Sequence, residues 1–454
     1  MHPDYWLLLR SRKPLSVAAN PFFSLVYFSV VPINYLEIYK FVMIKKLTLE
    51  NWKSFRKADL YIDPITVLIG KNASGKSNII DAFDFLSRIA RKETVETALN
   101  GNGNTLEIRG GSEWATRKSE YEFSLKVVID GDQYSDYLYS VTIDTNKGLS
   151  LKHESINLIT EKNREHLEPI EINSLLPDAS YYEIRQEHLE AYERLWTEQP
   201  SYPLYVEKKV LCSGFDSLQN AQVAHVKTFD LLRKIFVFNP IPSKMRNYSK
   251  LSPNLERDAS NIAGVIAALP EHQKLSLENE LCCYLAQIPE FKIEKVWVEI
   301  VGSRGEDAIL YCEETLNEKA SPLQIYPRVM SDGILKFLAL LTAMLTLPAH
   351  SLVVIEEVEN GLHPSRAGLL LEMLRDIGKK RQIDVLLTTH NPALLDELIP
   401  DFLPFVMIVY RNMETGESQI IPLEDMDNLA KLISSGSLGE IVRESLLENS
   451  LQRL

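Results

Sequence analysis

Cysteine is scarce in this sequence. Only 4 of the 454 residues are cysteines, and no two of them stand in a Cys-x-x-Cys pair, which argues against the common zinc-binding patterns. Cys282 and Cys283 are adjacent and lie in an apolar stretch. We interpret them as small core residues of a protein in a reducing compartment, rather than as a disulfide.

Excess positive charge, internal repeats and low-complexity tracts are also missing. The 62 acidic residues outnumber the 49 basic ones, and a net charge of −13 excludes the overall basic field of a dedicated nucleic-acid binder. A local basic cluster precedes residue 60 and consists of Lys45, Lys46, Lys53, Arg56 and Lys57. We interpret this cluster as the solvated edge of a strand, with a nucleic-acid contact as the alternative.

No apolar run is long enough to cross a bilayer. Residues 14–36 carry no charge and follow three basic residues, but prolines interrupt the segment. Its cleanest apolar piece, residues 22–33, is about half of the ~20 residues that a membrane-spanning helix needs. We interpret residues 1–42 as a translated leader or a disordered appendage, with a membrane tether as the alternative. The expected location is the cytoplasm, without a membrane partner.

The length fits two or three domains, each with its own core. Residues 43–159 are expected to form a first lobe, in which strands lead to a helix and then to an antiparallel β meander. Residues 160–235 change to amphipathic helical patterns, as at residues 182–195, and predict a helical insertion. Residues 236–454 predict a second lobe that mixes helices and strands. Sustained heptads are absent, which excludes a long coiled-coil arm.

A glycine-rich loop follows the apolar run at residues 65–69. It has the phosphate-binding pattern and consists of Gly70, Lys71, Asn72, Ala73, Ser74, Gly75, Lys76 and Ser77. The glycines let successive N–H groups turn toward phosphate oxygens. Lys76 can reach the β- and γ-phosphates, and the Ser77 hydroxyl can bind Mg²⁺. A helix over residues 74–92 would place its positive end under the phosphates. The segment therefore predicts binding of a nucleoside triphosphate.

Two adjacent acids end a second buried strand, at residues 351–355. In phosphate-loop ATPases an acid at this point holds Mg²⁺, and we assign Glu356 to that role. The second acid, Glu357, can polarise the attacking water. The alternative is a pair of surface acids, but the preceding run is apolar and residues 359–364 have the form of a tight functional loop.

Two more segments extend the predicted site. The strand at residues 384–389 ends in His390, whose imidazole can contact the γ-phosphate and report its loss; the alternative is a histidine without a function. Ser331 has the form of a helix N-cap, with Asp332 and Gly333 in the first turn. The free N–H groups there can bind an anion, although the same pattern also marks an ordinary helix start.

Taken together, these segments resemble the predicted AAA ATPases with ABC-type heads, which are relatives of RecF, the SMC proteins and the OLD nucleases. The resemblance covers most of residues 43–400 and includes Arg246, which fits the shorter ATPases of this group. It implies an α/β phosphate-loop NTPase fold with an ABC-type head, to which we add the predicted meander and insertion. Val358 departs from the family, whose members often have proline after the acidic pair.

The resemblance implies more than the spacing does. It implies that ATP and Mg²⁺ bind, that Asn72 positions the γ-phosphate or the water, and that two protomers enclose two nucleotides. Residues 331–333 of one protomer would touch the γ-phosphate held by the phosphate loop of the other. ATP binding would then close a homodimer and hydrolysis would open it, since the γ-phosphate favours the closed state.

The predicted function is an ATPase whose dimerisation controls a DNA-related process, either repair or anti-phage defence, with a partner effector and a contact to DNA. One alternative is an ATPase subunit that supports a separate nuclease. Only about 60 residues follow His390, fewer than the ~100 of a typical small domain, so we expect no nuclease within the chain. A transporter subunit is disfavoured by the insertion and the Ser-Asp-Gly segment, and a non-catalytic ATP-sensing scaffold is disfavoured by Glu357.

Overall fold

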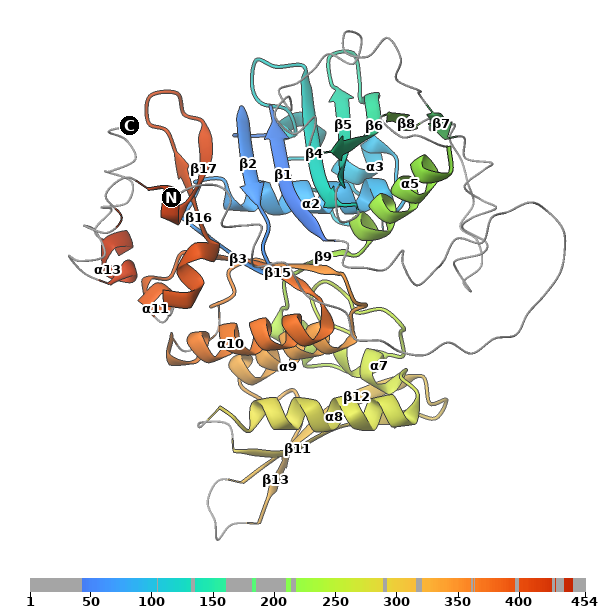
Figure 1. Ribbon diagram of the computed structural model, residues 1–454. Helices are drawn as coiled ribbons and strands as arrows, with labels where there is room; N and C mark the ends of the chain where they lie inside the picture. Colours follow the sequence, from blue (N-terminus) through green and yellow to red (C-terminus); the bar gives the residue numbers. More distant parts are fainter. Residues whose placement is uncertain are drawn as a thin grey trace, which may run out of the picture. The chain divides into compact units, whose positions relative to one another are not determined.

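The computed structural model describes residues 43–103, 105–131, 135–160, 182–184, 210–213, 218–288, 292–315, 321–360, 362, 364–396, 400–426, 429 and 437–443. The interpretation of residues 1–42 lies outside these ranges. Within them, every helix is too short or too polar to span a membrane. Helices and strands carry the labels of Figure 1.

A six-stranded sheet joins the two halves of the sequence, in the order β17-β16-β3-β15-β14-β9. The strands are β3 (Ile65–Ile69), β9 (Ile235–Phe238), β14 (Leu352–Ile355), β15 (Asp384–Thr389), β16 (Val406–Arg411) and β17 (Ser418–Pro422). All neighbours pair in parallel except β16 and β17. Because parallel strands end at the same edge of a sheet, the segments after β3, β15 and β14 come together.

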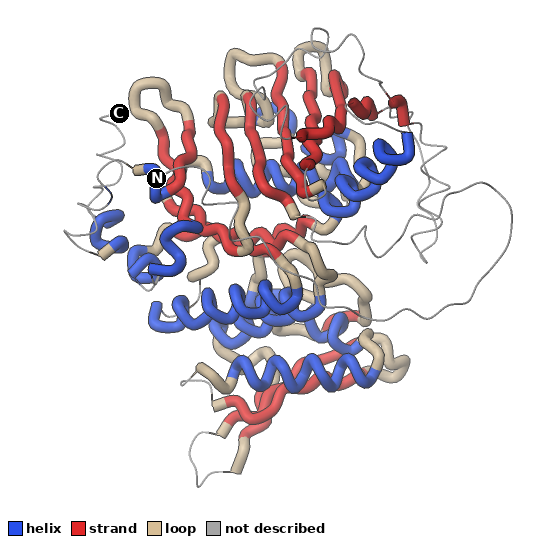
Figure 2. Tube along the Cα trace, in the orientation of Figure 1, coloured by secondary structure: helices blue, strands red, loops and turns tan. Residues whose placement is uncertain are grey.

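Both faces of this sheet are covered, which explains why its strands read as continuous apolar runs. Along β3, Val67 and Ile69 join the core that contains α9 (Asp332–Thr346) and α10 (Pro364–Arg381). Leu68 points the other way, into the core that contains α2 (Lys76–Ala90). Figure 2 shows helices on both sides of these strands.

A seven-stranded sheet forms the outer layer beyond α2 (Figure 1), in the order β2-β1-β4-β5-β6-β8-β7. Its strands are β1 (Ile44–Glu50), β2 (Lys57–Tyr61), β4 (Glu122–Asp130), β5 (Ser135–Asp144), β6 (Ser150–Thr160), β7 (Tyr182–Ile184) and β8 (Val210–Ser213). The β4-β5-β6 pairs are antiparallel, which confirms the predicted meander. Every second side chain of β4 is buried, as expected for a sheet with one packed face.

The predicted helical insertion at residues 160–235 needs a partial correction. Residues 182–184 form strand β7 rather than a helix, and β8 pairs in parallel with β6, so both strands extend the seven-stranded sheet. The helix α5 (Leu218–Arg233) is present as predicted. Pairing at a sheet edge outweighs helix propensity in a short segment, and the local pattern does not report such pairing. The other residues of this segment lie outside the described ranges.

A small antiparallel sheet lies in the second half of the chain, with β12 (Asp307–Glu314) at its centre. The other strands and the helices beside it are β10 (Ser249–Lys250), β11 (Ile293–Val301), β13 (Leu323–Ile325), α7 (Ile262–Ala267) and α8 (Glu271–Leu285). Helix α8 exposes Cys283 and half-buries Cys282, so the core interpretation is wrong for Cys283; both thiols are free. The remaining elements are α3 (Val95–Asn100), η2 (Ser112–Trp114), α6 (Pro242–Met245), α11 (Pro392–Asp396), η4 (Pro400–Phe405), η5 (Leu423–Asp425) and α13 (Leu438–Arg443).

An ion-pair network anchors α2 to the second half of the chain. The buried carboxylate of Asp84 accepts hydrogen bonds from Arg88 Nη2 at 2.8 Å and from Arg257 Nη1 at 2.6 Å. Burial raises the pKa of Asp84, but Arg257 and Arg88 outweigh burial, so the pKa lies below its ordinary value of 3.8. The network therefore holds the helix of the phosphate loop against a residue 173 positions away.

Substituting Asp84→Asn is expected to lower the free energy of unfolding by about 3 kcal/mol at pH 7, because it removes the buried negative charge with which both guanidinium groups pair. The native pKa lies below the unfolded value, so this stabilisation is present above pH 3.8 and is lost as the pH falls through the native pKa. Urea unfolding at pH 7 and at falling pH measures both effects.

The matched control is Glu122→Gln, which breaks an ion pair with Lys152 in which both side chains are about half exposed. This change is expected to have a much smaller effect, because solvent screens exposed pairs. Equal losses of stability in the two variants would contradict the anchoring role of Asp84.

Candidate active site

The phosphate-binding loop packs closely against strands β16 and β17. Residue Gly70 has φ +149°, and a Cβ there would lie 2.1 Å from the carbonyl oxygen of Val409 in β16. Gly75 has φ +118°, and a Cβ there would lie 2.7 Å from Ser418 Oγ in β17. Only glycine fits such contacts at positive φ. Residues 71–73 are exposed, so the apex of the loop is open to a ligand.

Lys76 begins α2 and folds back over the loop. Its Nζ donates to the carbonyl oxygens of Gly70 at 2.5 Å and Lys71 at 2.9 Å. Burial lowers the pKa of Lys76, while Glu357, Glu359 and Glu356 act in the opposite direction. The buried Ser74 Oγ has no hydrogen-bond partner, and α2 has no side-chain N-cap. A phosphate would give partners to the ammonium, the hydroxyl and the first-turn amides, so the loop fits that group.

Ser77 and Glu356 meet across the sheet edge, although 279 positions separate them. The Ser77 hydroxyl donates to Glu356 Oε1 at 2.7 Å, and Arg109 Nη2 donates to the other carboxylate oxygen. Hydroxyl and carboxylate oxygens are ligands that Mg²⁺ accepts. Among the described residues, no group of three or more His, Cys, Asp or Glu side chains could hold a metal by itself. Nucleotide phosphates and water would therefore have to complete a Mg²⁺ site here.

Glu357 occupies a constrained position. Its φ is +47°, and its N–H donates to Thr388 Oγ1 in β15 at 2.9 Å. One carboxylate oxygen accepts from Asn360 Nδ2 at 2.5 Å, and the other lies 3.4 Å from His390 Nδ1. The two predicted groups Glu357 and His390 are thus brought together, with the carboxylate oriented by an amide. Such a triad of groups can hold a carboxylate ready to accept a proton.

Glu359 belongs to the candidate site in addition to the residues predicted from the sequence. Its side chain is only 5% exposed, and its Oε1 accepts from the His390 backbone N–H at 3.1 Å. The same oxygen lies 3.6 Å from His390 Nδ1. Glu359 therefore anchors the segment that carries His390. The only signal in the sequence was its position in the tight loop after the acidic pair.

Ser331 caps α9 as predicted, because its Oγ accepts from the Ile334 N–H at 3.2 Å. Asp332 accepts from Arg246 Nη2 at 2.5 Å, and Arg246 Nη1 also donates to the Met330 carbonyl at 2.9 Å. Ser331 and Asp332 are exposed, whereas Gly333 is buried. Arg246 thus fixes a segment that presents its helix start to solvent.

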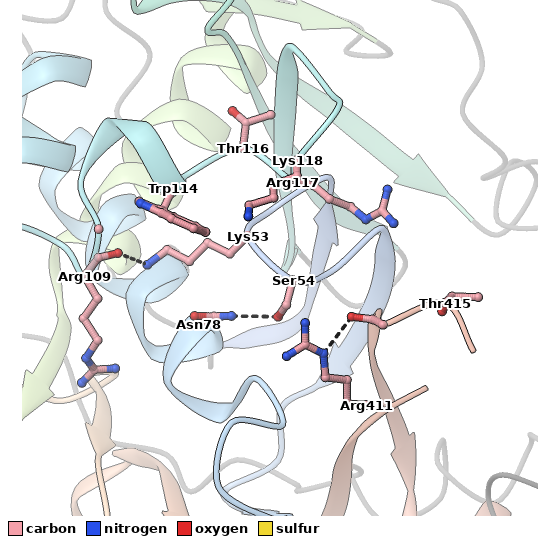
Figure 3. A pocket seen from close by; sticks show the side chains of 12 residues that line it. Lys53, Ser54, Asn78, Arg109, Trp114, Thr116, Arg117, Lys118, Arg411 and Thr415 are labelled. Atoms are coloured by element: carbon pink, nitrogen blue, oxygen red, sulfur yellow. Dashed lines mark hydrogen bonds between the residues drawn. The ribbon is translucent and has the colours of Figure 1, made fainter. Parts of the chain in front are cut away.

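A cavity of about 660 Å³ opens beside the first turns of α2 (Figure 3). It is lined by Lys53, Ser54, Asn78, Arg109, Gly110, Trp114, Thr116, Arg117, Lys118, Arg411, Thr415 and Gly416. Asn78 Nδ2 donates to Ser54 Oγ at 2.7 Å, which joins α2 to the turn after β1. The exposed fraction of Trp114 is 54%, and Lys118 Nζ lies 4.7 Å from the centre of its ring.

The interpretation of the basic cluster as a solvated edge is wrong for Lys53. Its side chain is only 6% exposed, and Nζ donates to Asp81 Oδ2 at 2.6 Å and to the Arg109 carbonyl at 2.8 Å. The φ of +52° at Lys53 marks a tight turn that directs the side chain inward. No local pattern distinguishes this lysine from its exposed neighbours.

Two family profiles match the chain. One, described as "AAA ATPase domain", matches residues 43–260, and the other, described as "AAA domain, putative AbiEii toxin, Type IV TA system", matches residues 313–396. The ATP/GTP phosphatase of Helicobacter pylori is 24% identical over 371 residues, which are 78% of this chain and 87% of that protein. The DNA replication and repair protein RecF of Lactobacillus acidophilus is 31% identical over 86 residues, which are 18% of this chain and 22% of that protein.

The solved structure of an SMC head bound to the C-winged helix domain of ScpA covers 84% of this chain and 97% of that chain, with 12% identity and a TM-score of 0.47. The fold assignment depends instead on the strand order, the phosphate loop and the profiles. The two profiles together contain every residue predicted for the site. The chain is therefore an ATPase of the AAA type.

Proposed function

We propose that this edge of the central sheet hydrolyses ATP by attack of a water that Glu357 activates. The observation that carries the proposal is the convergence of three strand ends. The Ser77–Glu356 hydrogen bond of 2.7 Å joins the end of β3 to the end of β14, and the Glu357–His390 approach of 3.4 Å adds the end of β15. A phosphate bound at the loop would face all of these groups.

Binding of the triphosphate would use the loop and its lysine. Lys76 exchanges the Gly70 and Lys71 carbonyls for phosphate oxygens, while the loop amides and the Ser74 hydroxyl donate to the same group. Asn72, at the exposed apex, positions the γ-phosphate. Ser77 and Glu356 would hold Mg²⁺, which would neutralise charge on the phosphates. Arg109 pairs with Glu356 and also lines the cavity.

The proton from water passes to the Glu357 carboxylate. The Asn360 amide and the backbone N–H of Glu357, bonded to Thr388, keep that carboxylate in one orientation. Residue His390 lies on the other side of the carboxylate and contacts the γ-phosphate, while Glu359 holds its backbone. A positioned carboxylate base contributes on the order of 10²–10⁴ to a rate of this kind.

The cavity of Figure 3 is proposed to take the nucleoside end of the substrate. It adjoins the first turn of α2, through Asn78 and Ser54, which is where the sugar and base of a nucleotide held at the loop would extend. The indole of Trp114 offers a stacking surface for a base. Arg109, whose side chain is half exposed, adds positive charge at the cavity.

Closure of a homodimer around ATP is part of the same proposal. Its support is the exposed start of α9 at residues 331–332, which Arg246 holds in place. Four exposed apolar side chains lie close in sequence either to Arg246 or to the start of α9. They are Tyr248, Leu251, Tyr326 and Val329. Such a surface suits contact with a second copy whose bound phosphate meets the α9 amides.

A DNA-related role with a partner effector such as a nuclease is the broader part of the proposal. Its support is the 31% identity to RecF, a DNA replication and repair protein, over 86 residues. The net charge of −13 argues against tight non-specific DNA binding. An ATPase assay with and without duplex DNA at low salt tests this part: stimulation supports it, and an unchanged rate contradicts it.

Glu357→Gln is expected to lower kcat for ATP hydrolysis about 100-fold or more, because the amide cannot accept the proton. ATP binding is expected to persist, so the variant should accumulate as a dimer with ATP and Mg²⁺. Phosphate release and light scattering measure the two effects. The control is Glu372→Gln, on the exposed side of α10, which should keep the wild-type rate. A Glu357→Gln variant as fast as wild type would refute the assignment of the base.

Glu356→Gln is expected to raise the free Mg²⁺ concentration for half-maximal hydrolysis at least tenfold, because a charged ligand is replaced by a neutral one. Chelation of divalent ions should abolish turnover in the wild type. Titration of Mg²⁺ at fixed ATP provides the measurement, with Glu372→Gln again as the control. An unchanged Mg²⁺ requirement would show that Glu356 does not hold the metal.

Trp114→Ala is expected to weaken ATP binding about tenfold, which is the range of stacking by one aromatic side chain. Calorimetric titration in the Glu357→Gln background measures this affinity without turnover. The matched control is Tyr121→Ala, since Tyr121 is similarly exposed but does not line the cavity. Equal ATP affinities in the two variants would show that the cavity is not part of the nucleotide site.

A further inference from the structure

A buried lysine joins the start of α9 to the loop that carries Glu357. Lys336 lies five residues after Ser331, and its exposed fraction is only 3%. Its Nζ donates to the carbonyl oxygen of Asn360 at 2.6 Å and to that of Glu357 at 3.1 Å. The Lys336 ammonium therefore bridges the first and last residues of the loop at positions 357–360.

The contacts of Lys336 bear on the orientation of the Glu357 carboxylate. Asn360 donates its side-chain amide to that carboxylate at 2.5 Å, so Lys336 holds the main chain of both the donor and the acceptor. The backbone of Glu357 is in the left-handed region, with φ +47°, which is costly for a residue with a Cβ. The ammonium compensates for that cost by bonding to the carbonyl of the same residue.

The charge of Lys336 is also balanced within this loop. Burial lowers the pKa of Lys336 to about 8, while Glu359 and Glu357 favour its charged form. Glu359 is 5% exposed and in turn holds the backbone of His390. The lysine, the two glutamates and the histidine segment thus form one continuous set of contacts.

We propose that Lys336 is a positioning residue for hydrolysis, which fixes the 357–360 loop and couples it to the first turn of α9. Helix α9 is a rigid connection of one and a half turns between Ser331 and Lys336. A ligand or subunit that binds at Ser331 would therefore shift the Lys336 ammonium and, with it, the Glu357 carboxylate. This inference rests on the proposed role of Glu357 as the base.

The test compares Lys336→Met and Lys336→Arg with wild type. Lys336→Met keeps the length of the side chain but cannot donate, so kcat is expected to fall about 10- to 100-fold, the cost of a base displaced by a fraction of an ångström to 1 Å. The ATP affinity, measured by titration in the Glu357→Gln background, should change less than threefold. Lys336→Arg, which can donate to both carbonyls, should recover most of kcat. A Lys336→Met variant with wild-type kcat overturns the proposal.

A matched control separates positioning from general support of α9. Arg381 Nη2 donates to the carbonyl of Leu347, directly after the other end of the same helix, at 3.1 Å. Arg381→Met should lower the melting temperature but leave kcat unchanged. If Arg381→Met lowers kcat as much as Lys336→Met does, the effect is one of helix stability and the proposal fails. Should Lys336→Met not fold, Lys336→Gln is judged by the same criteria.

The double variant Lys336→Met/Glu357→Gln distinguishes this inference from the proposed function. The rate should fall no further than in Glu357→Gln alone, because no base remains to be positioned. Full additivity of the two losses overturns the role of Lys336 while the role of Glu357 stands. A fully active Glu357→Gln variant overturns the proposed function, and the inference with it.

Discussion

The pairing of β3, β15 and β14 as parallel neighbours is the constraint on which the site depends. Each strand contributes a single short segment at its carboxyl end, and the sheet spacing brings these segments within reach of one another. Without this order, Ser77 and Glu356 would be unrelated positions 279 residues apart. The mostly apolar character of the strands follows from the same constraint, because hydrophobic cores cover both faces of the sheet.

Burial of charge around α2 is the second physical theme. Asp84 is held by Arg88 and Arg257, and Asp81 is held by Lys53. Burial raises the pKa of Asp81 and lowers that of Lys53, and each partner partly offsets the shift of the other. Helix α2 is therefore fixed at two positions within the two turns that follow the phosphate loop.

The family assignment and the proposed chemistry have different support. The profiles and the fold identify an AAA-type ATPase head. The roles of Glu357, His390 and residues 331–333 are proposals that the geometry supports through specific contacts. Lys336 links two of these elements inside one chain, which gives a physical route by which events at the start of α9 could influence hydrolysis. Coupling of this kind needs a rigid element between the sites, and α9 is one.

The sequence by itself determined the phosphate loop, the two strands that precede the acids and His390, the N-cap at Ser331 and the fold class, because each of these is a contiguous pattern with a local physical cause. Only the tertiary structure decided the burial of Lys53, the anchoring role of Glu359, the bridge made by Lys336 and the strands at residues 182–184 and 210–213. Those features depend on which distant segments become neighbours. The sequence around a lysine or a glutamate does not reveal its partner, because the order of strands in the sheet decides which residues become neighbours.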